Sequence, residues 1–267
     1  MRHLLQYIAI FFLSAKIHLQ SALEYKRAFI IQVLGMVLNN GSFLFFWWII
    51  YHRFADSFQA RDIAFSQIIM VWAIASAAFG LMHLLLGGSR HLSECIVNGK
   101  LDIYLLYPRQ PLFMAAIAKA HVSAMGDLAY GYLLFFIFLP FGMKELLVFT
   151  TMVCLSALLL AGLLVILNCL TFFLGNAEQA KETFFASTIN FATYPEGIFS
   201  PFIKFLLFSI LPVGLYVYLP VRLLTAFSFK GLLLLVAGDC LVLALACLVF
   251  RLGLKHYESG NLFYVHK

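Results

Sequence analysis

Charge is what this chain of 267 residues has least of. Only 11% of its residues are charged and 63% are hydrophobic, with a mean hydropathy of +0.96, whereas about a quarter of a soluble domain is charged. A soluble core does not explain this composition, because apolar blocks of about 20 residues recur, the length that crosses a hydrocarbon layer of roughly 30 Å. The composition predicts an all-α polytopic membrane protein.

The sequence also lacks the motifs of redox chemistry and catalysis. Its five cysteines form no CxxC pair and four fall inside apolar blocks, so we interpret them as small buried hydrophobes. There is no HExxH, no GxSxG and no glycine-rich nucleotide loop ending in GK[ST], and the eight histidines are dispersed. We therefore predict no catalytic residue, no cofactor and no metal site, with any ATP hydrolysis on a separate chain. The net charge of +6 is scattered among the apolar blocks, which argues against a nucleic-acid partner.

The apolar blocks predict six spans in one transmembrane domain, residues 28–267, after an N-terminal helix over residues 1–27. In residues 1–27 polar and basic side chains interrupt the apolar ones, a pattern typical of a helix that lies in the membrane interface. A poor first span is the alternative. The predicted spans cover residues 28–51, 63–86, 116–139, 146–174, a short helix over 178–194, and 231–250.

Prolines divide the stretch between the fifth and last spans. Pro195, Pro201, Pro212 and Pro220 leave pieces too short to cross a bilayer. We predict a re-entrant helical pair within residues 195–229, since irregular backbone at membrane depth is tolerated where protein or a cavity covers it. The alternative is a kinked ordinary span over about 202–219, which would leave residues 184–194 on the cytoplasmic side.

Basic residues set the predicted orientation. With six spans, twelve Lys and Arg residues fall on one side and six on the other. The positive-inside rule then predicts that both termini, the loop 87–115 and the tail 251–267 are cytoplasmic.

Five polar residues inside the predicted spans are candidates for a buried role. An amide in lipid favours an interhelical hydrogen bond, and a carboxylate there calls for a partner, a water-filled path or a proton. Helix packing is the simpler explanation for the amides, and a structural or water-facing role competes with a proton relay for the first acid. The candidates are Asn39, Asn40, Asp127, Asn168 and Asp239.

One stretch between two apolar blocks is built for contact with something other than lipid. In residues 94–111, Asn98 and Gly99 form a turn dipeptide, the run LDIYLLYP follows, and Pro108 and Pro111 break the chain again. This pattern predicts a short helix of about seven residues, pinned at both ends. Our hypothesis is that it lies on the cytoplasmic face and receives force from a partner.

Three segments carry a family resemblance: NGKLDIYLLYPRQPL at 98–112, YPEGIFSPFIKFLLFSILPVGLYVYLPVRLL at 194–224 and GLKHYESGNL at 253–262. Their order and spacing resemble the membrane subunits of bacterial type 2 ABC exporters, in the branch with a G-x-L-D-x-x-L-x-x-P loop. The resemblance covers the whole six-span layout.

The resemblance implies a permease subunit in the bacterial plasma membrane. It would pair with a second copy or a related six-span permease, bind two cytoplasmic ABC ATPase subunits, and use its N-terminal helix as a second contact. The loop 87–115 would present a coupling helix to the ATPase, with Asp102 offering a charge to a basic residue there. The residues that match the coupling motif are Gly99, Leu101, Asp102, Leu105 and Pro108.

Two other functions remain as alternatives. A proton- or ion-coupled secondary transporter would use Asp127 and Asp239, but such transporters are often built from internal repeats, and the two halves of this chain show no convincing repeat. An integral membrane enzyme acting on lipids would need a cluster of His, Asp or Glu at a membrane face, and the sequence shows none. The Phe-rich apolar faces suit a lipid-like or drug-like substrate as well as ordinary lipid contact.

Overall fold

The computed structural model of the chain describes residues 2–139, 142–175 and 178–257. Every regular element in these residues is a helix, as the composition predicts. Four helices there are long and apolar enough to cross a membrane, or five if one bent pair counts as a span. The four are α2 (Lys26–Arg53), α4 (Phe65–Leu85), α9 (Met143–Cys169) continued by α10 (Thr171–Leu174), and α14 (Phe229–Leu254).

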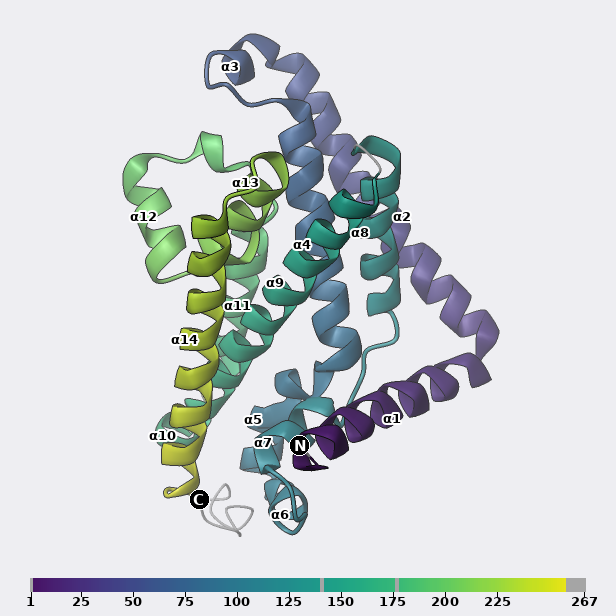
Figure 1. Cartoon of the computed structure of the whole chain (residues 1–267), viewed down its shortest axis with the longest axis vertical. Helices are drawn as coiled ribbons and strands as arrows, with labels where there is room; N and C mark the ends of the chain where they lie inside the picture. The colour runs from purple at the N-terminus through teal and green to yellow at the C-terminus, as the bar shows by residue number, and fades with distance from the viewer. Residues whose placement is uncertain (1, 140–141, 176–177, 258–267) are drawn as a thin grey trace.

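The long helices form an elongated body with two distinct ends (Figure 1). Helix α6, the start of α1 and the end of α14 lie toward the lower end, and α3 marks the upper end. Shorter elements complete the fold. They are α1 (Arg2–Glu24), α3 (Ala55–Gln59), η1 (Gly87–His91), α5 (Leu92–Val97), α6 (Leu101–Leu105), α7 (Pro111–Ile117), α8 (Ala124–Phe138), α11 (Glu178–Phe191), η2 (Glu196–Ile198), α12 (Pro201–Ser209), η3 (Gly214–Tyr218) and α13 (Leu219–Thr225).

The centre of the body is α4 and α9, whose apolar windows are mostly buried, while α2 and α14 lie at the periphery. Small residues allow a close approach of α4 and α8. A Cβ on Gly80 would lie 2.4 Å from the backbone nitrogen of Leu128, and one on Gly131 would lie 2.5 Å from the carbonyl oxygen of Ala73. Helices α4 and α8 therefore pack backbone against backbone, as small residues permit.

The third predicted span, residues 116–139, is wrong in its first third. Helix α8 has only 15 residues, and Lys119 and His121 lie in the connection between α7 and α8. A tertiary contact explains why the helix begins later than predicted. A Cβ on Gly88 would lie 2.0 Å from the carbonyl oxygen of Ala115, so η1 and the end of α7 touch through their backbones, and the chain turns at this contact before α8 begins.

Helices α12 and α13 form a bent pair, broken at residues 210–213. The angle between Pro201–Ser209 and Gly214–Thr225 is 89°. The chain enters α12 and leaves α13 at the upper end of the body (Figure 1). An ion pair between Glu196, just before α12, and Arg222, near the end of α13, joins the two ends of the pair.

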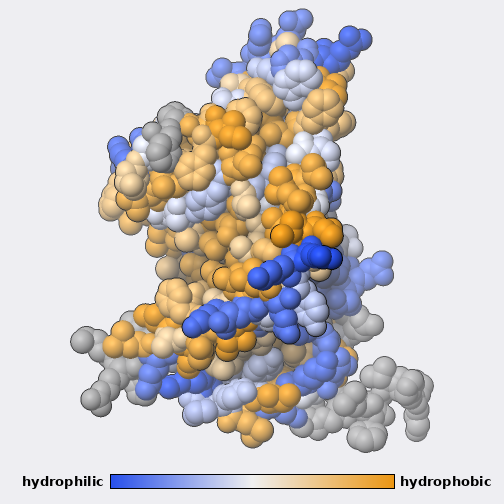
Figure 2. All heavy atoms as spheres, turned by 90° about the vertical axis from the view of Figure 1, so that its right-hand side faces the viewer, coloured by the Kyte–Doolittle hydropathy of each residue, from blue (hydrophilic) through white to orange (hydrophobic). Residues whose placement is uncertain are grey.

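The surface matches a chain that lies in a membrane. Figure 2 shows hydrophilic residues gathered toward the two ends of one face and a broad hydrophobic area between them. Cys154 and Cys240 are exposed, so the interpretation of the cysteines as buried hydrophobes is wrong for these two. Parts of the predicted turn 140–145 and the tail from residue 258 onward lie outside the described residues.

Candidate functional site

Helix α6 is the most prominent feature of the loop between α4 and α8. Gly99 turns the chain after α5 with a φ of +66°, a backbone conformation that favours glycine. Leu101 is fully buried, in a cluster with Leu92 and Ile96 of α5 and residues of α9 and α14. Leu101 therefore fixes α6 to its own chain and is not part of an exposed face.

The end of α6 and the residues that follow it are apolar and exposed. Ile103, Leu105 and Tyr107 are all exposed, and Leu106 is 86% exposed. Helix α6 lies at the lower end of the body (Figure 1), so these exposed side chains are carried there. We call Ile103, Leu105, Leu106 and Tyr107 the α6 tip. Pro108 follows the tip and ends the segment.

Asp102 lies beside Tyr257, so the loop motif meets the start of the tail motif. Burial and the neighbouring Asp102 carboxylate raise the pKa of Tyr257 to about 12. This contact joins two of the three segments that carry the family resemblance, although they are far apart in the sequence. Asp102 thus has an intramolecular neighbour, where the sequence suggested a basic residue on a partner.

The N-terminal helix α1 holds the other end of the loop. The guanidinium of Arg109 donates a hydrogen bond of 2.6 Å to Gln6 and lies over the ring of Tyr7. The Tyr7 hydroxyl accepts a hydrogen bond of 3.1 Å from the backbone of Gln110, and the Tyr7 ring packs edge-on against Phe113. Helix α1 and the loop therefore form one unit.

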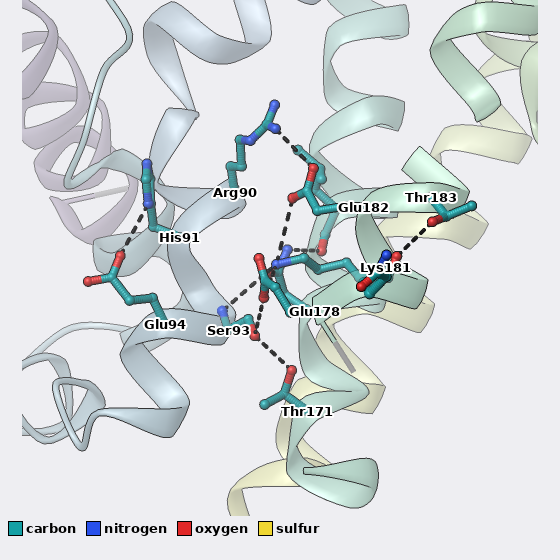
Figure 3. A network of polar contacts seen from close by, with 12 residues as sticks. Arg90, His91, Ser93, Glu94, Thr171, Glu178, Lys181, Glu182 and Thr183 are labelled. Atoms are coloured by element: carbon teal, nitrogen blue, oxygen red, sulfur yellow. Dashed lines mark hydrogen bonds and ion pairs between the residues drawn. The ribbon is translucent and has the colours of Figure 1, made fainter. Parts of the chain in front are cut away.

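A polar network lies between α5, α10 and α11 (Figure 3). Ser93 of α5 bonds Thr171 of α10 at 2.9 Å and Glu178 of α11 at 3.2 Å. The buried amine of Lys181 donates to Glu178 at 2.7 Å. Beside it, Arg90 pairs with Glu182 at 3.0 Å.

Asn168, near the end of α9, is the centre of this network. Its side-chain oxygen accepts hydrogen bonds from the backbone of Ser93 at 3.0 Å and from Lys181 at 3.2 Å. Its side-chain nitrogen donates to the carbonyl oxygens of Ser89 and Leu164. A single buried amide thus links η1, α5, α9 and α11. A pocket of about 550 Å³ lies next to this network, with Arg90, Ser93 and Lys181 in its wall.

Charged groups also tie α5 to the residue just before α6 and to the chain just after α7. Glu94 pairs with Lys100 at 2.7 Å and with Lys119 at 3.7 Å, and the hydrogen bond from Lys100 and the charge of Lys119 lower the pKa of Glu94. His91 stacks on His121, with 3.2 Å between their Nε2 atoms. Burial and nearby positive charges lower the pKa of both imidazoles, so the neutral forms are favoured.

The remaining polar candidates lie among the long helices. Asn40 of α2 donates a hydrogen bond of 2.6 Å to Asp127 of α8, so Asn40 makes an interhelical bond and Asp127 has a partner. Its neighbour Asn39 is exposed. Asp239 of α14 is buried, and neither of its carboxylate oxygens has a hydrogen-bond partner among the described residues.

Apart from the exposed Asn39, the structure therefore divides the predicted site residues among four places. The coupling-motif residues lie together in the loop, Asn168 lies directly beneath it, and the Asn40–Asp127 pair lies deeper, while Asp239 stands apart. No group of three or more His, Cys, Asp or Glu is arranged to hold a metal ion in the part of the chain described. Sequence reasoning missed Ser93 and Lys181. The charged residues just before residue 184 were the available signal for Lys181, and no motif marked Ser93.

Helices of this length and hydropathy, with an amphipathic N-terminal helix and a projecting loop, define a polytopic membrane protein. A family model described as an ABC-2 family transporter protein matches residues 37–260, and the chain belongs to that family. Neither the curated proteins nor the solved structures gave a match. The family identifies the chain as a permease of an ABC transporter, a transport subunit that associates with ABC ATPase partners.

Proposed function

We propose that the chain is the permease subunit of an ATP-driven exporter in the bacterial plasma membrane, coupled to separate ATPase subunits through α6. Two permeases, identical or related, would form the translocation path between them. The observation that carries this proposal is the α6 tip, an exposed apolar surface at the end of a helix that the buried Leu101 anchors to its own chain. Membership of the ABC-2 family favours this function over a secondary transporter that uses Asp127 and Asp239.

The contacts beneath α6 suit the transmission of a push. Leu101 packs in one cluster with residues of α5, α9 and α14. Ser93 and Asn168 then connect α5 to α9 and α11 by hydrogen bonds. A movement of α6 would therefore reach several long helices as a rigid-body displacement, since closely packed interiors transmit strain.

The proposal includes six membrane crossings. These are α2, α4, α8, α9, α11 and α14, with α12 and α13 as a re-entrant pair that enters and leaves at one side. The bend of 89° and the ion pair between Glu196 and Arg222 support the re-entrant arrangement. Helices α8 and α11 are short for a span, with 15 and 14 residues, so their flanking connections would complete the crossing. Both termini and α6 would face the cytoplasm.

Leu106→Asp tests the coupling role of α6. Because Leu106 is almost fully exposed, its replacement leaves the internal contacts of the loop intact while it places a charge in an apolar interface. We expect the variant to reach the membrane at normal levels, but to lose co-purification with the ATPase or the stimulation of ATP hydrolysis, by on the order of tenfold or more.

Phe54→Asp is the matched control, because Phe54 is an exposed apolar residue next to α3 at the other end of the body. The control should retain the ATPase. An intact complex and unchanged ATP-driven transport in Leu106→Asp would show that the ATPase does not dock on α6. A change at Asp102 is less informative, because it would also disturb the contact with Tyr257.

A further inference from the structure

A cavity of about 260 Å³ lies between the long helices, in walls made by α2, α4, α8, α11 and η3. Its lining combines one carboxylate, Asp127, with aromatic rings from α2, α4 and η3. The amides of Asn39 and Asn190, both exposed residues, stand at its rim. None of the coupling contacts described above involves this cavity.

Asp127 is incompletely satisfied by its own chain. The residue is 4% exposed, and Asn40 occupies only one of its oxygens, Oδ1. The second oxygen, Oδ2, is buried and has no hydrogen-bond partner among the described residues, and no Lys or Arg there forms an ion pair with Asp127. A carboxylate at membrane depth with a free oxygen calls for a cation or a proton from outside the chain.

Burial disfavours the ionised form of the Asp127 carboxylate, and two local features offset part of this cost. Asp127 lies in the first turn of α8, where the helix dipole presents positive potential. The hydrogen bond from the Asn40 amide likewise stabilises the charged form. A bound cation would therefore find a negative charge that the protein already stabilises in part.

Aromatic side chains decide which kind of cation fits. Phe43 and Trp72 stack at 5.7 Å between ring centroids, and Tyr216 uses its hydroxyl to bond the backbone of Ala75. The Asp127 carboxylate is the one acidic group among the described residues of the lining, whose other side-chain oxygens belong to neutral amides and hydroxyls, and the ring faces attract organic cations. Hard metal ions such as Ca²⁺ and Mg²⁺ instead take six or more oxygen ligands. Trp72 adds a buried indole N–H without a partner among the described residues.

The rim of the cavity opens on a polar face of α11. Thr183 and Asn190 are both exposed and lie seven residues apart, on the same side of the helix. A polar helix face is unfavourable toward lipid, so this face suits an aqueous path or a second permease. A ligand can thus reach the cavity from the region that a translocation path would occupy.

We propose that this cavity binds the ammonium group of a small organic amine, with the N–H⁺ donating to Asp127 Oδ2 and the apolar part lying against Phe43 and Trp72. Such a charge-assisted hydrogen bond is short and strong. A role of the amine as the transported substrate rests on the proposed function. The binding itself does not depend on it.

Equilibrium binding of radiolabelled 2-phenylethylamine to the full chain in lipid nanodiscs tests the proposal. At pH 7 the probe is protonated, and 2-phenylethanol provides a neutral competitor with the same carbon skeleton. We expect saturable binding that 2-phenylethanol does not displace. Asp127→Asn keeps the side-chain volume and should weaken binding by on the order of 30-fold or more, because a buried charge loses its counter-ion.

Two further variants complete the design. Asp239→Asn removes the other buried intramembrane carboxylate, which does not line this cavity, and should leave the affinity unchanged. Phe43→Ala keeps the carboxylate and should weaken binding several-fold. The Phe43→Ala variant also tests whether the amine binds in this cavity if Asp127→Asn fails to fold. Phe43 is 51% exposed, so its replacement disturbs little packing.

Three results would overturn the inference: no saturable binding to the wild-type chain, equal displacement by 2-phenylethanol, or unchanged affinity in both Asp127→Asn and Phe43→Ala. The outcome is separate from that of the coupling test. Loss of the ATPase in Leu106→Asp with amine binding retained supports both proposals. A chain that binds amine but never co-purifies with an ATPase would contradict the proposed function alone.

Discussion

At the scale of single residues, the polar side chains inside the helical body differ in how fully they are satisfied. Asn168 uses both side-chain atoms in hydrogen bonds to three other segments of the chain. Asp127 shares one oxygen with Asn40, and Asp239 has no hydrogen-bond partner among the described residues. A fully bonded amide is a structural joint, whereas an incompletely bonded carboxylate is open to a ligand or a proton.

Asn168→Ala tests the joint. The substitution leaves the buried Ser93 backbone N–H and the Lys181 amine without that acceptor, and each such loss costs about 1–3 kcal/mol. We expect a lower melting temperature for the solubilised chain and weaker coupling between ATP hydrolysis and transport. Asn190→Ala removes an exposed amide from α11 and serves as the control for stability. Equal melting temperatures for the two variants would contradict the assignment of Asn168 as a joint.

At the scale of elements, the loop between α4 and α8 is held from two directions. Helix α1 contacts its outer part through Tyr7 and Gln6, and Ser14 of α1 donates a hydrogen bond of 2.8 Å to the carbonyl oxygen of Ile117. The hydrophobic cluster around Leu101 holds its inner part. The short helix α6 is therefore stabilised by tertiary contacts, since five residues are far below the length at which a helix is stable alone.

Tyr7→Ala tests the contribution of α1. The variant loses a hydrogen bond, a ring contact and the cation–π contact with Arg109. We expect the loop to open more often, so that trypsin cleaves after Arg109 several-fold faster in inside-out vesicles. Tyr25→Ala is the control, because Tyr25 is exposed at the break between α1 and α2. Equal cleavage rates in both variants would mean that α1 does not restrain the loop.

At the scale of the whole molecule, the unanswered question is which elements cross the membrane. Four helices qualify by length and hydropathy, and the bent pair α12–α13 is either one broken span or a re-entrant loop. The two arrangements differ in where the pair begins and ends. A re-entrant pair has both ends on one side of the membrane, whereas a broken span has them on opposite sides.

Cysteine labelling decides between these arrangements. Ser200→Cys and Phe227→Cys place thiols just before α12 and just after α13. We expect a membrane-impermeant maleimide to label both from outside intact cells, and to label Asn98→Cys, beside α6, only after permeabilisation. The wild-type chain controls for its five native cysteines. Labelling of Ser200→Cys and Phe227→Cys from opposite sides would establish a broken span and contradict the six-span topology.

The sequence alone was sufficient for the class of protein and for most of the helices. The thickness of the membrane requires apolar segments of about 20 residues, so α2, α4, α9 and α14 could be predicted from the length of the apolar blocks. The break at Pro201 and Pro212 and the turn at Gly99 were also predictable, because proline and glycine act on the local backbone.

Tertiary structure decided what the individual residues contact. Only the fold buries Leu101 beneath α6, places Tyr257 beside Asp102, brings Asn40 of α2 to Asp127 of α8, and joins Ser93 to Asn168. It also shortened α8, through the backbone contact between Gly88 and Ala115. Because the long helices α2, α4 and α9 are apolar on nearly all sides, periodicity does not show which of their faces is buried, and helix packing selects the partners of their few polar groups.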